Sequence, residues 1–118
     1  MYLFSFEKLD VWQKSRSFAK EIYVTTKTYP EEEKYGLVSQ LRRAVVSVCS
    51  NISEGASRTS RNDQKHFYEI AFSSLMETMN QTIISFDMGY INSTRLDEFR
   101  RTIEMISYMI LKLRDSRV

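Results

Sequence analysis

The sequence predicts an all-α protein, a four-helix bundle formed by a single domain over residues 1–118. Apolar residues recur at steps of three and four in four separate segments, which is the period of an amphipathic helix. The chain has only three glycines and one proline, too few for the many tight turns of an all-β protein. Short polar connections separate the four segments, and such connections join antiparallel neighbours. We therefore expect an up-down-up-down arrangement.

The first two helices are predicted over residues 9–27 and 31–56. The first carries an apolar face that includes Trp12 and Phe18, and it ends before Pro30 because proline disfavours helical geometry at the preceding residue. Pro30 and the three glutamates after it suit the first turn of the second helix, where acidic groups complement the helix dipole.

The last two helices are predicted over residues 63–87 and 94–115. Ser93 or Thr94 can cap the fourth helix. The core-facing residues of that helix follow one another at steps of three and four, close to the coiled-coil period. They are Leu96, Phe99, Ile103, Ile106, Ile110 and Leu113.

The third helix has an apolar arc of about two-thirds of its circumference, whereas a bundle helix needs little more than about 100°. One stripe of this arc is assigned to the core. The second stripe consists of Tyr68, Phe72, Met76, Met79 and Ile83. These residues either pad the edges of the bundle or meet another chain. The apolar segment at residues 2–6 favours the second explanation, so we expect a homo-oligomer with this stripe as its interface.

Basic residues gather on the second helix and in the connection after it, although the whole chain carries a net charge of only +2. The candidate nucleic-acid-binding residues are Arg42, Arg43, Arg58, Arg61 and Lys65. Arginine matches phosphate oxygens, and the positive N-terminal end of the third helix lies nearby. A solvated polar face and a polar subunit interface are the alternatives for the same residues.

Catalytic, metal and cofactor sites are not expected. A single cysteine, Cys49, and a single histidine, His66, cannot complete a four-ligand zinc site. The sequence contains no Gly-rich phosphate loop, nucleophile elbow or Glu-x-x-His pair. It also lacks a signal peptide and an apolar run long enough for a membrane span, which predicts a cytoplasmic protein that does not contact the membrane.

Five segments together resemble one protein family. They are residues 6–13 (FEKLDVWQ), 29–37 (YPEEEKYGL), 39–44 (SQLRRA), 50–55 (SNISEG) and 89–91 (GYI). This combination is similar to the 23S rRNA-intervening sequence proteins, whose relatives include the accessory variability proteins of diversity-generating retroelements. The resemblance implies a four-helix bundle that assembles as a ring-like homopentamer. For the retroelement relatives it also implies binding to nucleic acid and to a reverse transcriptase.

Two hypotheses about function follow. In the first, the protein is a non-catalytic oligomeric scaffold that associates with RNA or DNA. In the second, it is a structural or protein-interaction bundle without a nucleic-acid role. Affinity for mixed nucleic acid that falls as salt rises separates them. The biological process, the specific partner and the subunit number do not follow from the sequence.

Overall fold

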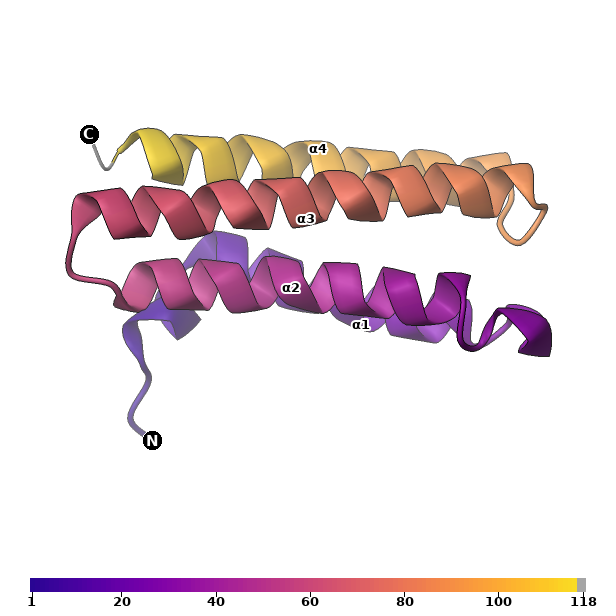
Figure 1. Ribbon diagram of the computed structural model, residues 1–118, viewed down its shortest axis with the longest axis horizontal. Coiled ribbons are helices and arrows are strands. Elements are labelled where there is room, and N and C mark those ends of the chain that lie inside the picture. Colours follow the sequence, from indigo (N-terminus) through magenta and orange to yellow (C-terminus); the bar gives the residue numbers. More distant parts are fainter. Residues whose placement is uncertain (117–118) are drawn as a thin grey trace.

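The computed structural model describes residues 1–116, which form an all-α four-helix bundle without a β-strand (Figure 1). The α-helices are α1 (Asp10–Thr26), α2 (Leu37–Ser57), α3 (Arg61–Asp87) and α4 (Ser93–Asp115). Two short 3-10 helices, η1 (Ser5–Lys8) and η2 (Glu31–Glu33), precede α1 and α2. The prediction of an all-α fold with four helices is confirmed.

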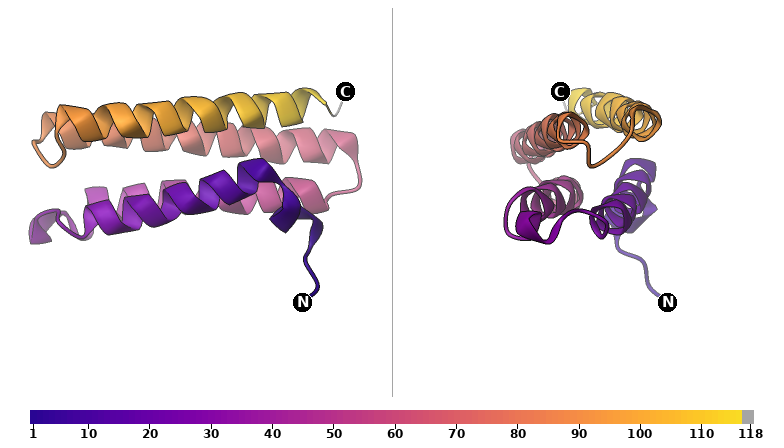
Figure 2. Two further views of the ribbon diagram at one scale, coloured as in Figure 1. Left: turned by 180° about the vertical axis from the view of Figure 1, so that it is seen from behind. Right: turned by 90° about the vertical axis from the view of Figure 1, so that its right-hand side faces the viewer.

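The four helices run side by side along the long axis of the molecule, in two layers. In Figure 1, α3 and α4 lie above α2 and α1, and the end view in Figure 2 shows the four helices surrounding a common interior. Both α1 and α3 pack against α2 and α4. The start of the chain and the α2–α3 connection lie at one end of the bundle, here called the terminal end. The η2 segment and the α3–α4 turn lie at the other, the turn end.

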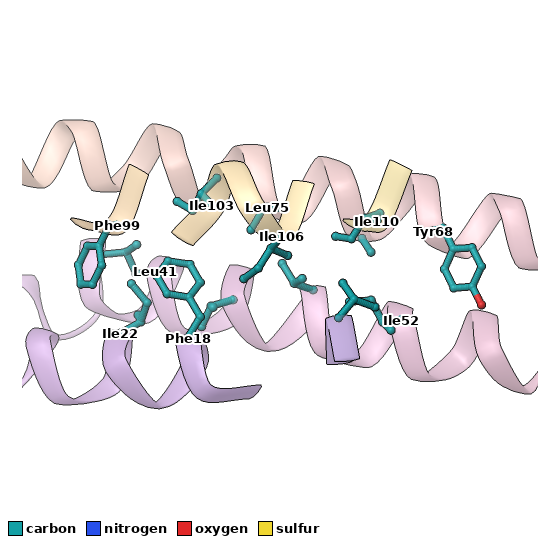
Figure 3. Packing of buried hydrophobic residues seen from close by; sticks show 14 of the residues in the cluster. Phe18, Ile22, Leu41, Ile52, Tyr68, Leu75, Phe99, Ile103, Ile106 and Ile110 are labelled. Carbon is teal, nitrogen blue, oxygen red and sulfur yellow. The ribbon is translucent and has the colours of Figure 1, made fainter. Parts of the chain in front are cut away.

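The interior is filled by aliphatic and aromatic side chains from all four α-helices (Figure 3). Phe18 of α1 meets Phe99 of α4 edge to face, with ring centroids 5.6 Å apart. The core-facing residues predicted for α4 are confirmed, since Phe99, Ile103, Ile106 and Ile110 are buried and Leu96 and Leu113 pack against the core.

The start of α2 differs from the prediction. Residues 31–36 form η2 and a turn, and α2 begins at Leu37. The carboxylate of Glu33 explains this difference, because it accepts hydrogen bonds from the N–H of Leu37 (3.2 Å) and the hydroxyl of Tyr90 (2.8 Å). One carboxylate thus satisfies an otherwise free N–H of α2 and connects the segment to the α3–α4 turn.

The other helix boundaries shift because of caps. Ser60 is the N-cap of α3 and accepts a hydrogen bond from the N–H of Asp63 at 3.2 Å, so this helix starts two residues earlier than predicted. Asn92, rather than Ser93 or Thr94, caps α4, and its side-chain oxygen accepts from the N–H of Arg95 at 2.8 Å.

The buried face of α3 is largely polar. Hydroxyl groups of Thr78, Thr82 and Ser85 each donate to the carbonyl four residues earlier, at 2.7–2.9 Å. These bonds satisfy the hydroxyls within the helix, so the residues can be buried without partners on α2 or α4. Their small side chains also allow close helix packing.

Candidate nucleic-acid interface

Three of the five predicted basic residues lie together at the terminal end. Arg58 follows α2, Arg61 opens α3, and Lys65 lies about one turn further along α3. The N-terminus of this 27-residue helix adds a partial positive charge at the same place. Asp63 in the first turn of α3 and Glu54 beside Arg58 offset part of this charge, so three basic side chains stand against two acidic ones. We call Arg58, Arg61 and Lys65 the cationic end.

Local contacts hold Arg58 in place. Its guanidinium lies 3.2 Å from the carboxylate of Glu54 and 4.7 Å from the ring centroid of Phe67. Its backbone carbonyl accepts a hydrogen bond from the side-chain amide of Gln64 at 2.8 Å. Because arginine carries five N–H donors and this side chain is exposed, donors remain for an external oxygen.

Arg42 and Arg43 belong to the opposite half of the bundle, which corrects the prediction of one continuous five-residue patch. Arg42 and Arg58 are about 24 Å apart along α2 at 1.5 Å per residue. The guanidinium of Arg42 donates to the hydroxyl of Thr26 (3.0 Å) and the carbonyl of Tyr23 (3.2 Å), and it stacks on the Tyr23 ring at 4.5 Å. Arg42 thus joins α2 to the last turns of α1, while Arg43 is exposed.

A stripe of α2 that contains Ser47 and Asn51 partly faces α3 instead of solvent. The hydroxyls of Ser47 and Ser74 are 2.8 Å apart, and the amide of Asn51 donates to the carbonyl of Ser47 at 2.8 Å. Gly55 continues the stripe and lies against the ring of Tyr68, which Figure 3 shows pointing from α3 toward α2. The sequence analysis did not predict this interface. The pattern that indicates it is the spacing of four residues between Ser47, Asn51 and Gly55, all of them small or polar.

The predicted oligomer stripe of α3 needs one correction. Tyr68 is 0% exposed and belongs to the core of its own chain. Its position opposite a glycine explains this, because the missing side chain of Gly55 leaves room for the ring. Phe72 and Met79 are partly buried against the core, Ile83 is half-buried, and Met76 is 37% exposed. Phe72, Met76, Met79 and Ile83 follow one another at steps of four, three and four, so they form a line along α3, here called the α3 seam.

An exposed aromatic segment precedes the first helix. Tyr2, Phe4, Phe6 and Trp12 form a row of rings with successive centroid distances of 5.3, 6.4 and 5.0 Å. We call this row the aromatic arm. Figures 1 and 2 show its first residues leaving the bundle at the terminal end. Tyr2 is 79% and Phe4 60% exposed, which is unusual for adjacent large aromatic side chains.

A cavity of about 350 Å³ lies between the arm and the last turn of α2. Aromatic side chains from the arm form one wall, and polar side chains from α2 form the other. The lining residues are Tyr2, Phe4, Ser5, Phe6, Ser53, Glu54 and Ser57. Glu54 also contacts Arg58, so the cavity adjoins the cationic end. The sequence had given no indication of this cavity, because its two walls lie about 50 residues apart in the chain.

Cys49 and His66 are the two other side chains whose chemistry we considered in the sequence. Burial raises the pKa of the Cys49 thiol to about 11, which keeps it protonated near neutral pH. His66 is exposed and lies edge to face with Phe67, at 5.6 Å between ring centroids. Within residues 1–116, no three His, Cys, Asp or Glu side chains lie close enough to share a metal ion. None of the helices described there is long and apolar enough to cross a membrane.

Comparison with known proteins gives a family match and a solved structure of similar fold. The family model described as "23S rRNA-intervening sequence protein" matches residues 7–112. The chain is similar to a crystal structure from Bacteroides thetaiotaomicron VPI-5482, of a protein with unknown function from the S23 ribosomal protein family. The two share 22% sequence identity and a TM-score of 0.81, over 89% of this chain and 95% of that one. No curated protein sequence matches.

Proposed function

This chain belongs to the 23S rRNA-intervening sequence protein family, and from that premise we propose that it is a non-catalytic, oligomeric bundle that associates with nucleic acid. The observation that carries the proposal is the cationic end, where Arg58, Arg61 and Lys65 surround the N-terminus of α3. Arginine and lysine side chains with a helix N-terminus supply charge and N–H donors to phosphate oxygens. Such contacts carry no base information, so we expect binding that tolerates many sequences.

Oligomerisation is the second part of this proposal. We propose that up-down-up-down subunits form a ring-like homopentamer, with the α3 seam as part of the interface. A ring of five chains would present the cationic end five times, and a long strand that reaches several copies would gain avidity without new contacts. Light scattering is expected to give a mass of about 70 kDa, since one chain has 14.0 kDa. A 14.0 kDa monomer at micromolar concentration would contradict the assembly proposal.

Substitution on two exposed methionines tests the interface. Met76→Glu places a charge in the α3 seam and is expected to reduce the mass measured by light scattering. Met105→Glu is the matched control, because Met105 is equally an exposed methionine but lies on α4. Both variants are expected to keep a cooperative helical melt. Equal masses for the two variants would move the interface away from the α3 seam.

Salt-dependent binding tests the nucleic-acid proposal directly. Fluorescence anisotropy with a mixed-sequence single-stranded RNA is expected to give affinity that falls steeply with salt, by about 0.7 in log–log slope per neutralised phosphate. Changing Arg58 and Arg61 to glutamine is expected to flatten the slope by roughly 1.4. The matched control changes Arg43 and Arg101 to glutamine, which removes the same charge from exposed positions elsewhere. A larger effect in the control would place the contact outside the cationic end.

A second candidate is a protein-interaction bundle without nucleic-acid binding. Exposed apolar side chains favour it, because they can bury area against a protein partner; they are Met76 of the α3 seam and Tyr2 and Phe4 of the aromatic arm. If the resemblance to retroelement accessory proteins holds, a reverse transcriptase is the partner that it implies. Absence of RNA and DNA binding at low salt by the intact oligomer would favour this second candidate.

A further inference from the structure

The cavity under the aromatic arm has one aromatic wall and one polar wall. Tyr2, Phe4 and Phe6 offer π faces, whereas Ser53, Ser57 and Glu54 offer hydroxyls and a carboxylate. The hydroxyls of Ser53 and Ser57 donate to backbone carbonyls of α2 at 2.8 Å, and the carboxylate of Glu54 accepts from Arg58 at 3.2 Å. Hydroxyl and carboxylate oxygens have more than one lone pair, so this wall can still accept hydrogen bonds from an occupant. The cavity therefore suits an occupant that is flat and aromatic on its faces and carries hydrogen-bond donors at its edge.

A nucleobase has this combination. Its faces stack on aromatic side chains, and its edge exchanges hydrogen bonds with polar groups. The volume of about 350 Å³ admits one base. The phosphates that flank this base would lie near Arg58, because the carboxylate of Glu54 both lines the cavity and contacts that guanidinium at 3.2 Å.

From this arrangement we propose that the cavity binds one unpaired base of a single-stranded nucleic acid, stacked on Tyr2 or Phe4. The inference rests on the proposed function and assigns a specific site to it. It also predicts a preference among bases. The ionised carboxylate of Glu54 only accepts hydrogen bonds, so it favours an edge that presents an amino group, as cytosine does. Uracil presents a carbonyl oxygen at the same position and is disfavoured.

Substitutions in the arm separate stacking from phosphate contact. Tyr2→Ala and Phe4→Ala are each expected to weaken binding of an oligocytidine about 5- to 150-fold, the range for loss of one base–aromatic stack. They are expected to leave the slope of log affinity against log salt unchanged, because stacking releases no counterions. The matched control is Tyr35→Ala, which removes an 87% exposed ring at the turn end and is expected to change nothing.

The carboxylate is tested with two pyrimidines of equal size. Intact protein is expected to bind oligocytidine at least about 5-fold more tightly than oligouridine, the lower bound for a specific base contact. Glu54→Gln introduces an amide that can also donate, so it is expected to reduce this ratio toward one. Equal affinities of the intact protein for the two oligomers would overturn the assignment of Glu54.

The outcomes distinguish this inference from the proposed function. The affinity could fall steeply with salt and depend on Arg58, yet be the same for Phe4→Ala and Tyr35→Ala. That result would overturn the stacking site and leave the proposed function standing. No binding of any single strand at low salt would overturn both. A loss of oligomer mass in Tyr2→Ala or Phe4→Ala, with unchanged affinity per chain, would assign the arm to contact between subunits and overturn the base site.

Discussion

Adding one methyl group at Gly55 is expected to destabilise the bundle, although alanine is the better helix former. A Cβ built on Gly55 would lie 2.5 Å from Cε1, 2.9 Å from Cδ1 and 3.1 Å from Cζ of Tyr68. Ordinary carbon–carbon contacts are about 3.5–4.0 Å, so the overlap approaches 1 Å. The ring of Tyr68 is rigid and 0% exposed, which leaves it no space to move aside. Relief requires a shift of α2 relative to α3.

The size of the effect follows from two opposing contributions. Overpacking a dense core costs typically 1–3 kcal/mol. Replacing a helical glycine by alanine returns roughly 0.5–1 kcal/mol. For Gly55→Ala we therefore expect a net loss of about 1–2 kcal/mol in the free energy of unfolding. This loss is a sizeable part of the 5–15 kcal/mol that is typical of a domain.

Urea denaturation at fixed protein concentration measures this loss, since the concentration also affects the stability of any oligomer. A double-mutant cycle with Tyr68→Ala isolates the contact. Without the ring, only the helix propensity remains, so Gly55→Ala is expected to stabilise the Tyr68→Ala background by roughly 0.5–1 kcal/mol. An unchanged or increased stability of Gly55→Ala in the presence of Tyr68 would refute the close-contact argument.

Three further predictions concern the core, a cap and pH. Ile106→Ala is expected to cost about 2–5 kcal/mol, against well under 1 kcal/mol for the exposed Arg100→Ala, as measured by urea denaturation. Asn92→Ala is expected to cost about 1 kcal/mol by the same measurement, because it removes the cap of α4. The hydrogen bond to Glu33 and burial raise the pKa of Tyr90 from 10.0 to about 12. The folded state therefore holds this proton more tightly, and its contribution to stability is present below pH 10 and is lost as pH rises toward 12. Tyr90→Phe is expected to reduce the fall in urea midpoint over that window; an equal fall would assign it to other groups.

The core was predictable where burial depends on apolar periodicity alone. Phe99, Ile103, Ile106 and Ile110 repeat at helical steps with polar neighbours, so only one face of α4 can be buried. In α3 the same reasoning gave the wrong phase for Tyr68. The core stripe predicted for this helix did contain Ser74, Thr78 and Thr82, which are buried. Hydrophobicity does not reveal the buried Gln81 and Ser85, because both are polar.

The candidate site was predictable only in part. The gathering of Arg58, Arg61 and Lys65 follows from the short connection between α2 and α3. The separation of Arg42 from Arg58 also follows from the rise of a single helix, once both are assigned to it. In contrast, the contact of Arg42 with α1 and the cavity under the aromatic arm depend on tertiary packing. Neither leaves a local pattern in the sequence.

The tight junction between α2 and α3 has a consequence for how the chain folds. The two helices pack extensively on one another, and only residues 58–60 connect them. Contacts between segments so close in sequence require little loop-closure entropy, so they form early and favour rapid folding. The fit of Gly55 to Tyr68 and the hydrogen bond between Ser47 and Ser74 penalise a slip of one helical turn between α2 and α3. The α2–α3 hairpin can thus reach its register as a unit, and α1 and α4 then complete the bundle on a template that is already aligned.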